Sequence, residues 1–143
     1  MASQPQSATA LTISSQTRDG VVILRARGEL DLGSAPVLRD RLREATERPA
    51  APALVVDLAE VSFCDSVGMS ELVLALHRSE DQGLRLALSG VHGSLERLLL
   101  ATGLHNVFDI HPTFVDAFRA VTAPGGPGRP GRAVTVPGGS SEG

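Results

Sequence analysis

The chain has 143 residues, of which 42% are hydrophobic, and a formal net charge of −3, so it has enough apolar material for one domain with a packed core. All 13 basic residues are Arg and lie scattered along the chain, so the concentrated positive charge of a nucleic-acid-binding protein is missing. The single cysteine, Cys64, excludes an intrachain disulfide and a cysteine-rich zinc site. Without Lys, neither a P-loop nor Schiff-base catalysis is available.

Membrane and export signals are also missing. No apolar run approaches the roughly 20 residues of a membrane-spanning helix. The first ten residues lack the basic and apolar regions of a secretory signal. We therefore expect a cytoplasmic protein with no membrane or nucleic-acid partner, beginning with a flexible N-terminus at residues 1–10.

The first predicted elements are two antiparallel strands. The segments Leu11–Gln16 and Val21–Leu30 flank Asp19-Gly20, a dipeptide that favours the tight turn of a β-hairpin. A helix follows, for which Ser34 is a candidate N-cap and Pro36 lies in the first turn, where its missing N–H is harmless. One face of this helix is apolar and comprises Val37, Leu38, Leu42 and Ala45.

The next elements alternate between strand and helix. A strand begins at Ala53 with an uninterrupted apolar run, as in a central strand buried on both faces, and a mostly apolar helix follows Ser66. The next strand–helix pair ends at Gly103, which suits the left-handed C-cap of a helix. The last helix has an apolar face at helical spacing: Phe114, Val115, Phe118 and Val121.

This order of elements predicts an α/β domain, with a mixed β-sheet and flanking helices, over residues 11–122. Residues 123–143 are rich in Pro, Gly and Ser and carry little that could be buried. We interpret them as a disordered tail.

The histidines do not predict a metal site, because none of them falls at a paired-ligand spacing. We therefore expect neither a metal nor another cofactor. The histidines are His77, His92, His105 and His111.

A glycine-containing loop, Ser89–Ser94, lies between a predicted strand and a predicted helix, where such loops sometimes cradle phosphate. It lacks both the G-x-G-x-x-G pattern and a following GK[ST]. A small-molecule or nucleotide-binding α/β domain that uses this loop together with Ser66 stays open as an alternative.

The stretch VSFCDSVGMS, Val61–Ser70, places an acid, a hydroxyl and a glycine at the end of an apolar run. Ser66 does not sit in the G-x-S-x-G elbow of serine hydrolases, because Cys64 stands where the first glycine would be. Asp65 or Ser66 is able to cap the following helix. Neither is followed three residues later by the Glu or Gln of a capping box.

Gly68 lies in the first turn of that helix, where glycine costs about 1 kcal/mol relative to alanine. Capping alone does not explain this cost. We interpret the glycine as removing bulk beside an exposed hydroxyl, so that another protein's backbone approaches Ser66, with Val67 and Met69 as apolar contact surface. Cys64 is expected to be a small buried residue whose pKa the neighbouring Asp65 raises.

Three segments of the chain, in this order, resemble the STAS domain and specifically the stand-alone bacterial anti-sigma factor antagonists. The resemblance covers nearly all of Leu11–Val121, and its most specific part is the D-S-x-G element at Asp65–Gly68. The segments are GELDLGSAPVLRDRL (residues 28–42), VVDLAEVSFCDSVGMSELV (55–73) and SGVHGSLERLLLATGLHNVFDI (89–110).

The resemblance implies a mixed sheet with flanking helices and a binding module that is not an enzyme. In this family the unphosphorylated antagonist binds an anti-sigma factor, often itself a serine kinase, and so frees a sigma factor. A separate serine phosphatase reverses the modification. Carried onto this chain, Ser66 is the phosphorylated residue, with Asp65 beside it and Asp31 close by. The implied partner surface, on a monomer or weak dimer, comprises Asp31, Gly33, Asp65, Ser66, Val67, Gly68 and Met69.

Two residues depart from the family pattern. Val67 replaces a second hydroxyl, which makes Ser66 the less ambiguous acceptor of phosphate. Ser70 replaces a glycine and is a minor rival acceptor one turn later. A STAS scaffold that is never phosphorylated stays open as a second alternative.

Overall fold

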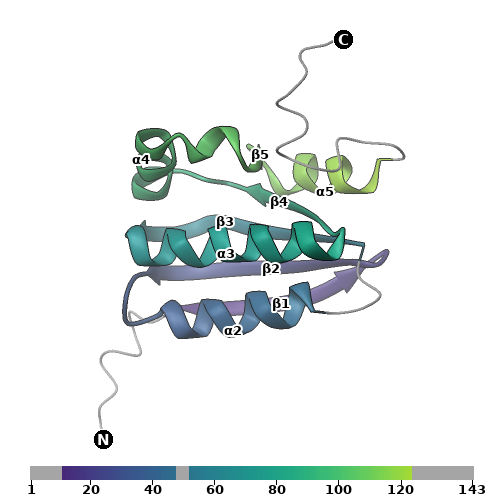
Figure 1. Cartoon of the computed structure of the whole chain (residues 1–143), viewed down its shortest axis with the longest axis horizontal. Helices are drawn as coiled ribbons and strands as arrows, with labels where there is room; N and C mark the ends of the chain where they lie inside the picture. Colours follow the sequence, from purple (N-terminus) through teal and green to yellow (C-terminus); the bar gives the residue numbers. More distant parts are fainter. Residues whose placement is uncertain (1–10, 48–51, 124–143) are drawn as a thin grey trace, which may run out of the picture.

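The computed structural model describes residues 11–47 and 52–123. Within these residues the chain forms a five-stranded sheet in the order β1-β2-β3-β4-β5 (Figure 1). Strand β1 is antiparallel to β2, and the other neighbouring pairs are parallel. The predicted α/β class with a mixed sheet is therefore confirmed. The elements are β1 (Thr12–Arg18), β2 (Val21–Leu30), α2 (Ala35–Thr46), β3 (Ala53–Cys64), α3 (Ser66–Gln82), β4 (Arg85–Ser89), α4 (Gly93–Thr102), the 3-10 turn η1 (Leu104–Asn106), β5 (Asp109–His111) and α5 (Phe114–Thr122).

Both ends of the chain reach beyond the described residues. The expected flexible N-terminus, residues 1–10, lies outside them, as do residues 124–143 of the expected tail. Ala123 is described, and its carbonyl accepts a hydrogen bond from Arg85 at 3.0 Å.

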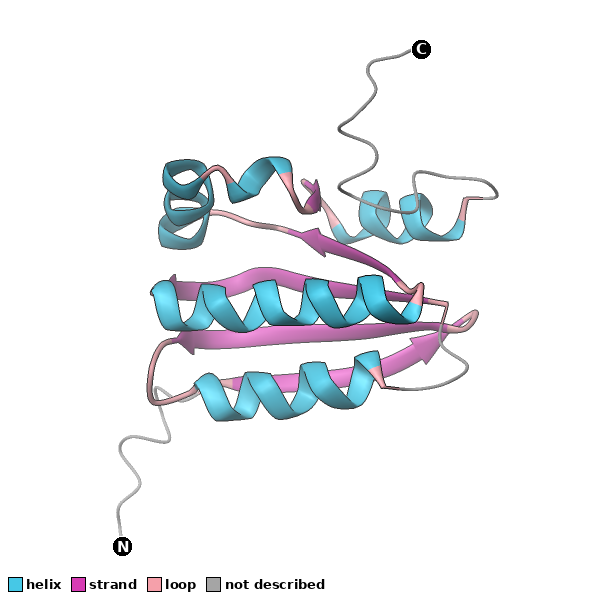
Figure 2. Cartoon of the chain, viewed as in Figure 1, coloured by secondary structure: helices cyan, strands magenta, loops and turns pink. Residues whose placement is uncertain are grey.

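The helices lie on both faces of the sheet (Figure 2). Helices α2, α3 and α4 pack over the larger core on one face. Helix α5 covers part of the other face, where Ala117 and Val121 meet Val21, Ile23 and Val55. Because β3 is covered on both sides at its amino end, its opening apolar run is completely buried, as the sequence predicted.

The first turn and the C-cap of α4 follow their predicted chemistry. Asp19 and Gly20 both have positive φ, 52° and 82°, as a two-residue hairpin turn requires. Gly103 closes α4 in the left-handed conformation with φ 78°. Each of these residues ends an element where the sequence predicted an end.

Two residues of the predicted apolar helix faces do not lie in the core. Val37 is 43% exposed and Val115 is 52% exposed. Successive helical residues are about 100° apart, and α2 turns Leu38 and Leu42 to the core, which leaves Val37 on the outer side. In α5 the inward position is taken by Ala117 rather than Val115.

Helices α2 and α3 are joined by an ion pair. Arg39 of α2 donates from Nε and Nη2 to Oε2 of the buried Glu71 of α3, at 3.2 and 3.0 Å. A buried carboxylate needs such a partner. The pair therefore fixes the two helices that follow β2 and β3 relative to each other.

Parallel strands place their carboxyl ends at one edge of the sheet, and here β3 extends well past β4. It pairs with β4 as far as Asp57 and with β2 as far as Cys64. The β2–β3 register shifts twice along this extension, between Arg25 and Arg27 and between Gly28 and Glu29. The edge formed by the ends of β2 and β3 is where the predicted functional residues lie.

Candidate functional site

Asp65 is the N-cap of α3. Its backbone is extended, with φ −102° and ψ −176°. Its carboxylate oxygen Oδ1 accepts hydrogen bonds from the backbone N–H groups of Val67 and Gly68, at 2.9 and 3.0 Å. The sequence left Asp65 and Ser66 as alternative caps, and the structure selects Asp65, which satisfies two free N–H groups without a capping box.

Ser66 is the first residue of α3, and its side chain is exposed. Within the described residues, no hydrogen bond engages the Ser66 hydroxyl. Ser70, one turn later, is also exposed, but its hydroxyl donates to the Ser66 carbonyl at 2.8 Å. The unengaged hydroxyl therefore lies at the positive end of a 17-residue helix.

The turn after β2 lies beside the start of α3. The Asp65 N–H donates to the Leu30 carbonyl at 3.0 Å, which joins the ends of β2 and β3. Asp31 follows directly and is partly buried. The two acids named by sequence reasoning, Asp31 and Asp65, thus begin adjacent connections at one edge of the sheet.

Ser34 occupies the N-cap position of α2 but does not cap it with its side chain in the described structure. Its hydroxyl instead donates to the Glu29 carbonyl at 2.6 Å and accepts the Asp31 N–H at 3.0 Å. The Asp31 carboxylate in turn accepts the Ser34 N–H at 3.0 Å. The Ser34 side chain therefore stabilises the turn between β2 and α2 and does not cap the helix. Gly33 is exposed in this turn, and a Cβ there would make only ordinary contact with Asp31, at 3.5 Å.

The interpretation of Gly68 as a point of approach for a partner is wrong. Gly68 is buried, and a Cβ there would lie 2.7 Å from Leu30 Cβ, 2.8 Å from the Leu30 carbonyl and 3.1 Å from Cys64 Sγ. The glycine lets α3 pack against the end of β2. Met69 is also buried in the core, so it is not exposed contact surface, whereas Val67 is partly exposed.

Cys64 is a buried residue at the end of β3, as predicted. Burial, and secondarily the charge of Asp65, raise the pKa of its thiol to about 12. Its backbone N–H donates to Ser94 Oγ at 2.7 Å. Cys64 is therefore a packing residue and not a reactive thiol.

Native Cys64 is expected to resist thiol reagents at neutral pH and to react once the chain unfolds, because the thiolate is the reactive form. Unfolding returns the pKa to near 9.0 from about 12. Above the unfolded value the unfolded state loses a proton that the folded state keeps, so stability falls as pH rises through this window. Ellman's reagent, with and without urea, tests the first expectation, and urea unfolding of wild type against Cys64→Ala across the window tests the second. Rapid labelling of the native thiol would contradict this assignment.

The Ser89–Ser94 loop uses its polar groups within the protein. Ser94 accepts the hydrogen bond from Cys64, and a ring nitrogen of His92 lies 3.1 Å from the Ala59 carbonyl. Gly90 has φ +70°, and a Cβ there would lie 2.8 Å from the Ala59 backbone. The loop is thus tied to the extension of β3, which accounts for its glycine and serine without a phosphate.

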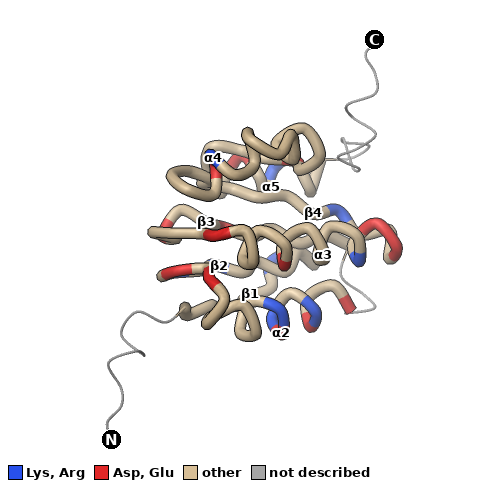
Figure 3. The backbone as a smooth tube through the Cα atoms, turned by 60° about the vertical axis from the view of Figure 1, so that its left-hand side comes forward, with Lys and Arg blue, Asp and Glu red and all other residues tan. Residues whose placement is uncertain are grey.

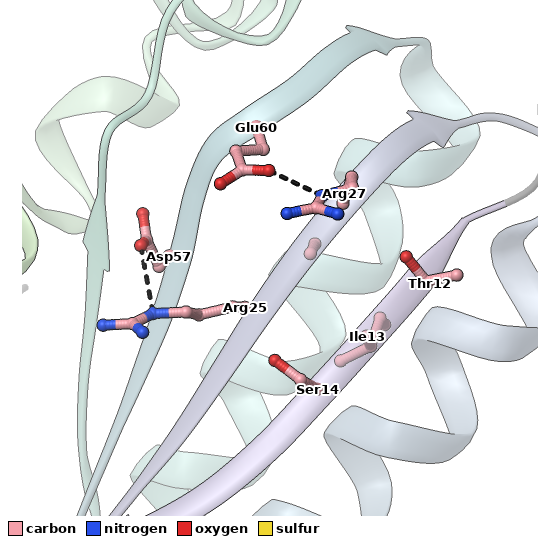
Figure 4. A pocket seen from close by; sticks show the side chains of 8 residues that line it. Thr12, Ile13, Ser14, Arg25, Arg27, Asp57 and Glu60 are labelled. Carbon is pink, nitrogen blue, oxygen red and sulfur yellow. Dashed lines mark hydrogen bonds and ion pairs between the residues drawn. The ribbon is translucent and has the colours of Figure 1, made fainter.

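A hollow of about 270 Å³ lies on the sheet face opposite α3 (Figure 4). Arg25 and Asp57 form an ion pair in it at 3.4 Å, and Arg27 pairs with Glu60 at 2.6 Å. The Arg25 guanidinium also lies over the Phe114 ring of α5, 4.6 Å from its centroid. The charges of the hollow compensate one another, so it lacks the unpaired cations of an anion site.

The described part of the chain has neither a metal-binding cluster nor a membrane-spanning helix. No group of three or more His, Cys, Asp or Glu residues there could hold a metal ion. No helix among residues 11–47 and 52–123 is long and apolar enough to cross a membrane.

Sequence reasoning missed two exposed apolar residues at the same edge, Leu32 and Phe63. Leu32 could have been found, because an apolar residue inside the polar turn D-L-G-S is a usable signal. Phe63 could not, because its exposure depends on the register shift near the end of β3.

Comparison with known proteins identifies the family of this chain. The model of the STAS domain matches residues 12–117. The chain is 30% identical over 112 residues to the anti-sigma-F factor antagonist RsfA of Mycobacterium tuberculosis, covering 78% of this chain and 88% of that protein. It is 39% identical over 83 residues to the anti-sigma-B factor antagonist of Bacillus subtilis, covering 58% and 74%. The crystal structure of an anti-sigma factor antagonist from Mycobacterium paratuberculosis superposes with a TM-score of 0.71 at 30% identity, over 78% of this chain and 93% of that chain. The chain therefore belongs to the STAS domain family.

Proposed function

We propose that this chain is an anti-sigma factor antagonist that binds an anti-sigma factor while Ser66 is unphosphorylated and is switched off by phosphorylation of Ser66. Relatives that match over most of their length bear the name of anti-sigma factor antagonists. The observation that carries the switch is the exposed Ser66 hydroxyl at the first position of α3, beside Asp65 and the Asp31 turn.

The position of Ser66 favours a modified residue over a nucleophile. Activation of a serine hydroxyl needs a neighbouring base. The adjacent carboxylate, Asp65, accepts two backbone N–H groups through Oδ1. We infer a binding module that is itself a substrate, with a serine kinase, often the anti-sigma factor, and a serine phosphatase as its modifying partners.

The free protein accepts a phosphate at Ser66 without refolding. The group adds about −1.5 to −2 charges at the positive end of α3, where an exposed anion is stabilised by about 0.3–1 kcal/mol. In a complex the same phosphate is desolvated beside Asp65 and Asp31. The proposed off-switch is therefore repulsion and desolvation at the interface, within a domain of residues 11–122 that works in the cytoplasm.

Phosphate is expected on Ser66 in the protein purified from its own host, because its hydroxyl is the unengaged one at the start of α3. Mass spectrometry of the intact chain and of its peptides measures this. Ser66→Ala is expected to abolish the modification while the chain stays folded and bound to its partner. Ser70→Ala, the matched control, is expected to leave it in place. Phosphate that persists in Ser66→Ala and disappears in Ser70→Ala would assign the switch to the wrong serine.

A further inference from the structure

Two exposed apolar side chains lie at the edge that carries Ser66. Leu32 is 72% exposed, the highest value among the large apolar residues of the described chain, and Phe63 is 43% exposed. Single exposed apolar residues are common on protein surfaces and need no explanation. Leu32 and Phe63 differ from such residues in the local structure that holds each side chain outward.

Leu32 is presented by a rigid turn. The Asp31 and Ser34 side chains each accept the other residue's backbone N–H, at 3.0 Å in both directions. The Ser34 hydroxyl also donates to Glu29 at 2.6 Å, and the Ala35 N–H donates to the Asp31 carbonyl at 2.8 Å. A turn fixed in this way loses little conformational freedom when a partner covers it.

Phe63 is turned outward by a β-bulge. Gly28 pairs with Val61 but Glu29 pairs with Phe63, so Ser62 is an extra residue in β3. Val61 and Cys64 are both buried, and the two residues between them are exposed. In a regular strand, Val61 and Phe63 would share a face. The bulge keeps Cys64 in the core and places an aromatic ring in solvent, and bulges commonly re-aim side chains beside functional sites.

The two segments that carry Leu32 and Phe63 meet at the start of α3, where Ser66 lies. The hydrogen bond from Asp65 to Leu30 joins the two connections. Leu32 follows Leu30 by two residues, and Phe63 precedes Asp65 by two. The same edge is acidic, since Glu29, Asp31 and Asp65 all lie there, and Figure 3 shows acidic positions at the ends of β2 and β3.

We propose that Leu32 and Phe63 are the apolar anchors by which this edge binds the anti-sigma factor, which presents an apolar socket with a basic rim. This inference rests on the proposed function and names the residues that carry its affinity. Binding energy at protein interfaces concentrates in a few buried anchors, aromatic ones prominent among them, surrounded by a polar rim. The acidic rim here calls for complementary cations on the partner, which steer association and set its salt dependence.

The test uses the full unphosphorylated chain and the purified anti-sigma factors of its own organism, titrated one by one by calorimetry. Leu32→Ala and Phe63→Ala are each expected to weaken binding about tenfold or more. Val115→Ala is the matched control, since that side chain is 52% exposed on α5, which packs at the amino ends of β2 and β3, and it is expected to bind as wild type. Thermal unfolding checks the fold, and Leu32→Ala, the more exposed site, is expected to leave the midpoint unchanged.

The outcomes separate this inference from the proposed function. Suppose that one anti-sigma factor binds the chain, that phosphorylation of Ser66 releases it, and that both alanine variants bind like wild type. The assignment of Leu32 and Phe63 as anchors is then wrong, while the proposed function stands. If no anti-sigma factor binds the wild-type chain, the function fails and the anchors with it. If the variants instead break self-association of the chain and leave partner binding intact, a second copy is the occupant and the inference is overturned.

Discussion

The chain phosphorylated on Ser66 is expected to bind its anti-sigma factor at least about a hundredfold more weakly than the unmodified chain. The phosphate would be enclosed beside Asp65, which caps α3, and beside the Asp31 turn that the Asp65–Leu30 hydrogen bond holds next to it. In the complex the cations of the partner's basic rim are already paired with Asp31 and Asp65, so the added phosphate has no counter-ion of its own. Enclosing such a charge costs about 3 kcal/mol or more, and about 1.4 kcal/mol corresponds to tenfold in affinity. Calorimetry with both forms of the full chain measures the ratio.

The neighbouring carboxylates supply matched variants. Asp65→Asn and Asp31→Asn each keep the Oδ1 acceptor, which serves the α3 cap in one case and the Ser34 N–H in the other. They remove one negative charge apiece. In the phosphorylated chain, each substitution is expected to raise the affinity for the anti-sigma factor several-fold. The gain is expected to be larger at low salt, where repulsion between like charges is less screened. Equal affinities of the phosphorylated and unmodified chains would refute the interfacial switch.

The strength of the local signals explains why much of the fold was predictable. The Asp19-Gly20 turn, the buried run from Ala53 and the left-handed Gly103 depend on neighbours in the sequence, and the structure has each of them in place. Ser66 could be located for the same reason, because the start of a helix after a buried strand is a local pattern. The choice of Ser66 as an acceptor of phosphate came from family resemblance, since no spacing encodes a kinase.

What the sequence could not reveal depends on contacts between distant segments. From the sequence, Gly68 is interpreted as a surface residue. In the structure a side chain there would collide with Leu30, which lies 38 positions earlier in the chain. In the sequence Phe63 draws no attention, as one more apolar residue of the strand that begins at Ala53. In the structure a register shift between β3 and β2 exposes its side chain. The first feature depends on the packing of α3 against the end of β2. The second depends on the pairing of β3 with β2, where a one-residue slip moves a side chain to the other face of the sheet.

Gly90→Ala is expected to lose about 3–4 kcal/mol of unfolding free energy, the largest stability change among the glycine variants. Two costs combine there. A left-handed conformation costs an L-residue roughly 1–2 kcal/mol, and Gly90 has φ +70°. Its Cβ would also lie 2.8 Å from the Cα, Cβ and N of Ala59, and overpacking adds about 1–3 kcal/mol. Urea unfolding at equilibrium measures the change.

Gly83→Ala separates these two costs. Gly83 also has φ +70°, but a Cβ there meets nothing within 4 Å among the described residues. It is expected to lose only about 1 kcal/mol, the conformational part alone. If Gly83→Ala and Gly90→Ala are equally destabilised, the contact between the Ser89–Ser94 loop and Ala59 is not a packing constraint.

Gly68→Ala tests the packing role of the glycine beside Ser66. Gly68 lies inside α3, where alanine is intrinsically favoured by about 1 kcal/mol. A glycine kept for a partner's approach would therefore give a more stable free protein when replaced. The close approach to Leu30 predicts the opposite sign, because the Leu30 carbonyl belongs to the backbone and the start of α3 would have to shift. We expect a net loss of about 1–2 kcal/mol of unfolding free energy, and a gain in stability would contradict the packing role of Gly68.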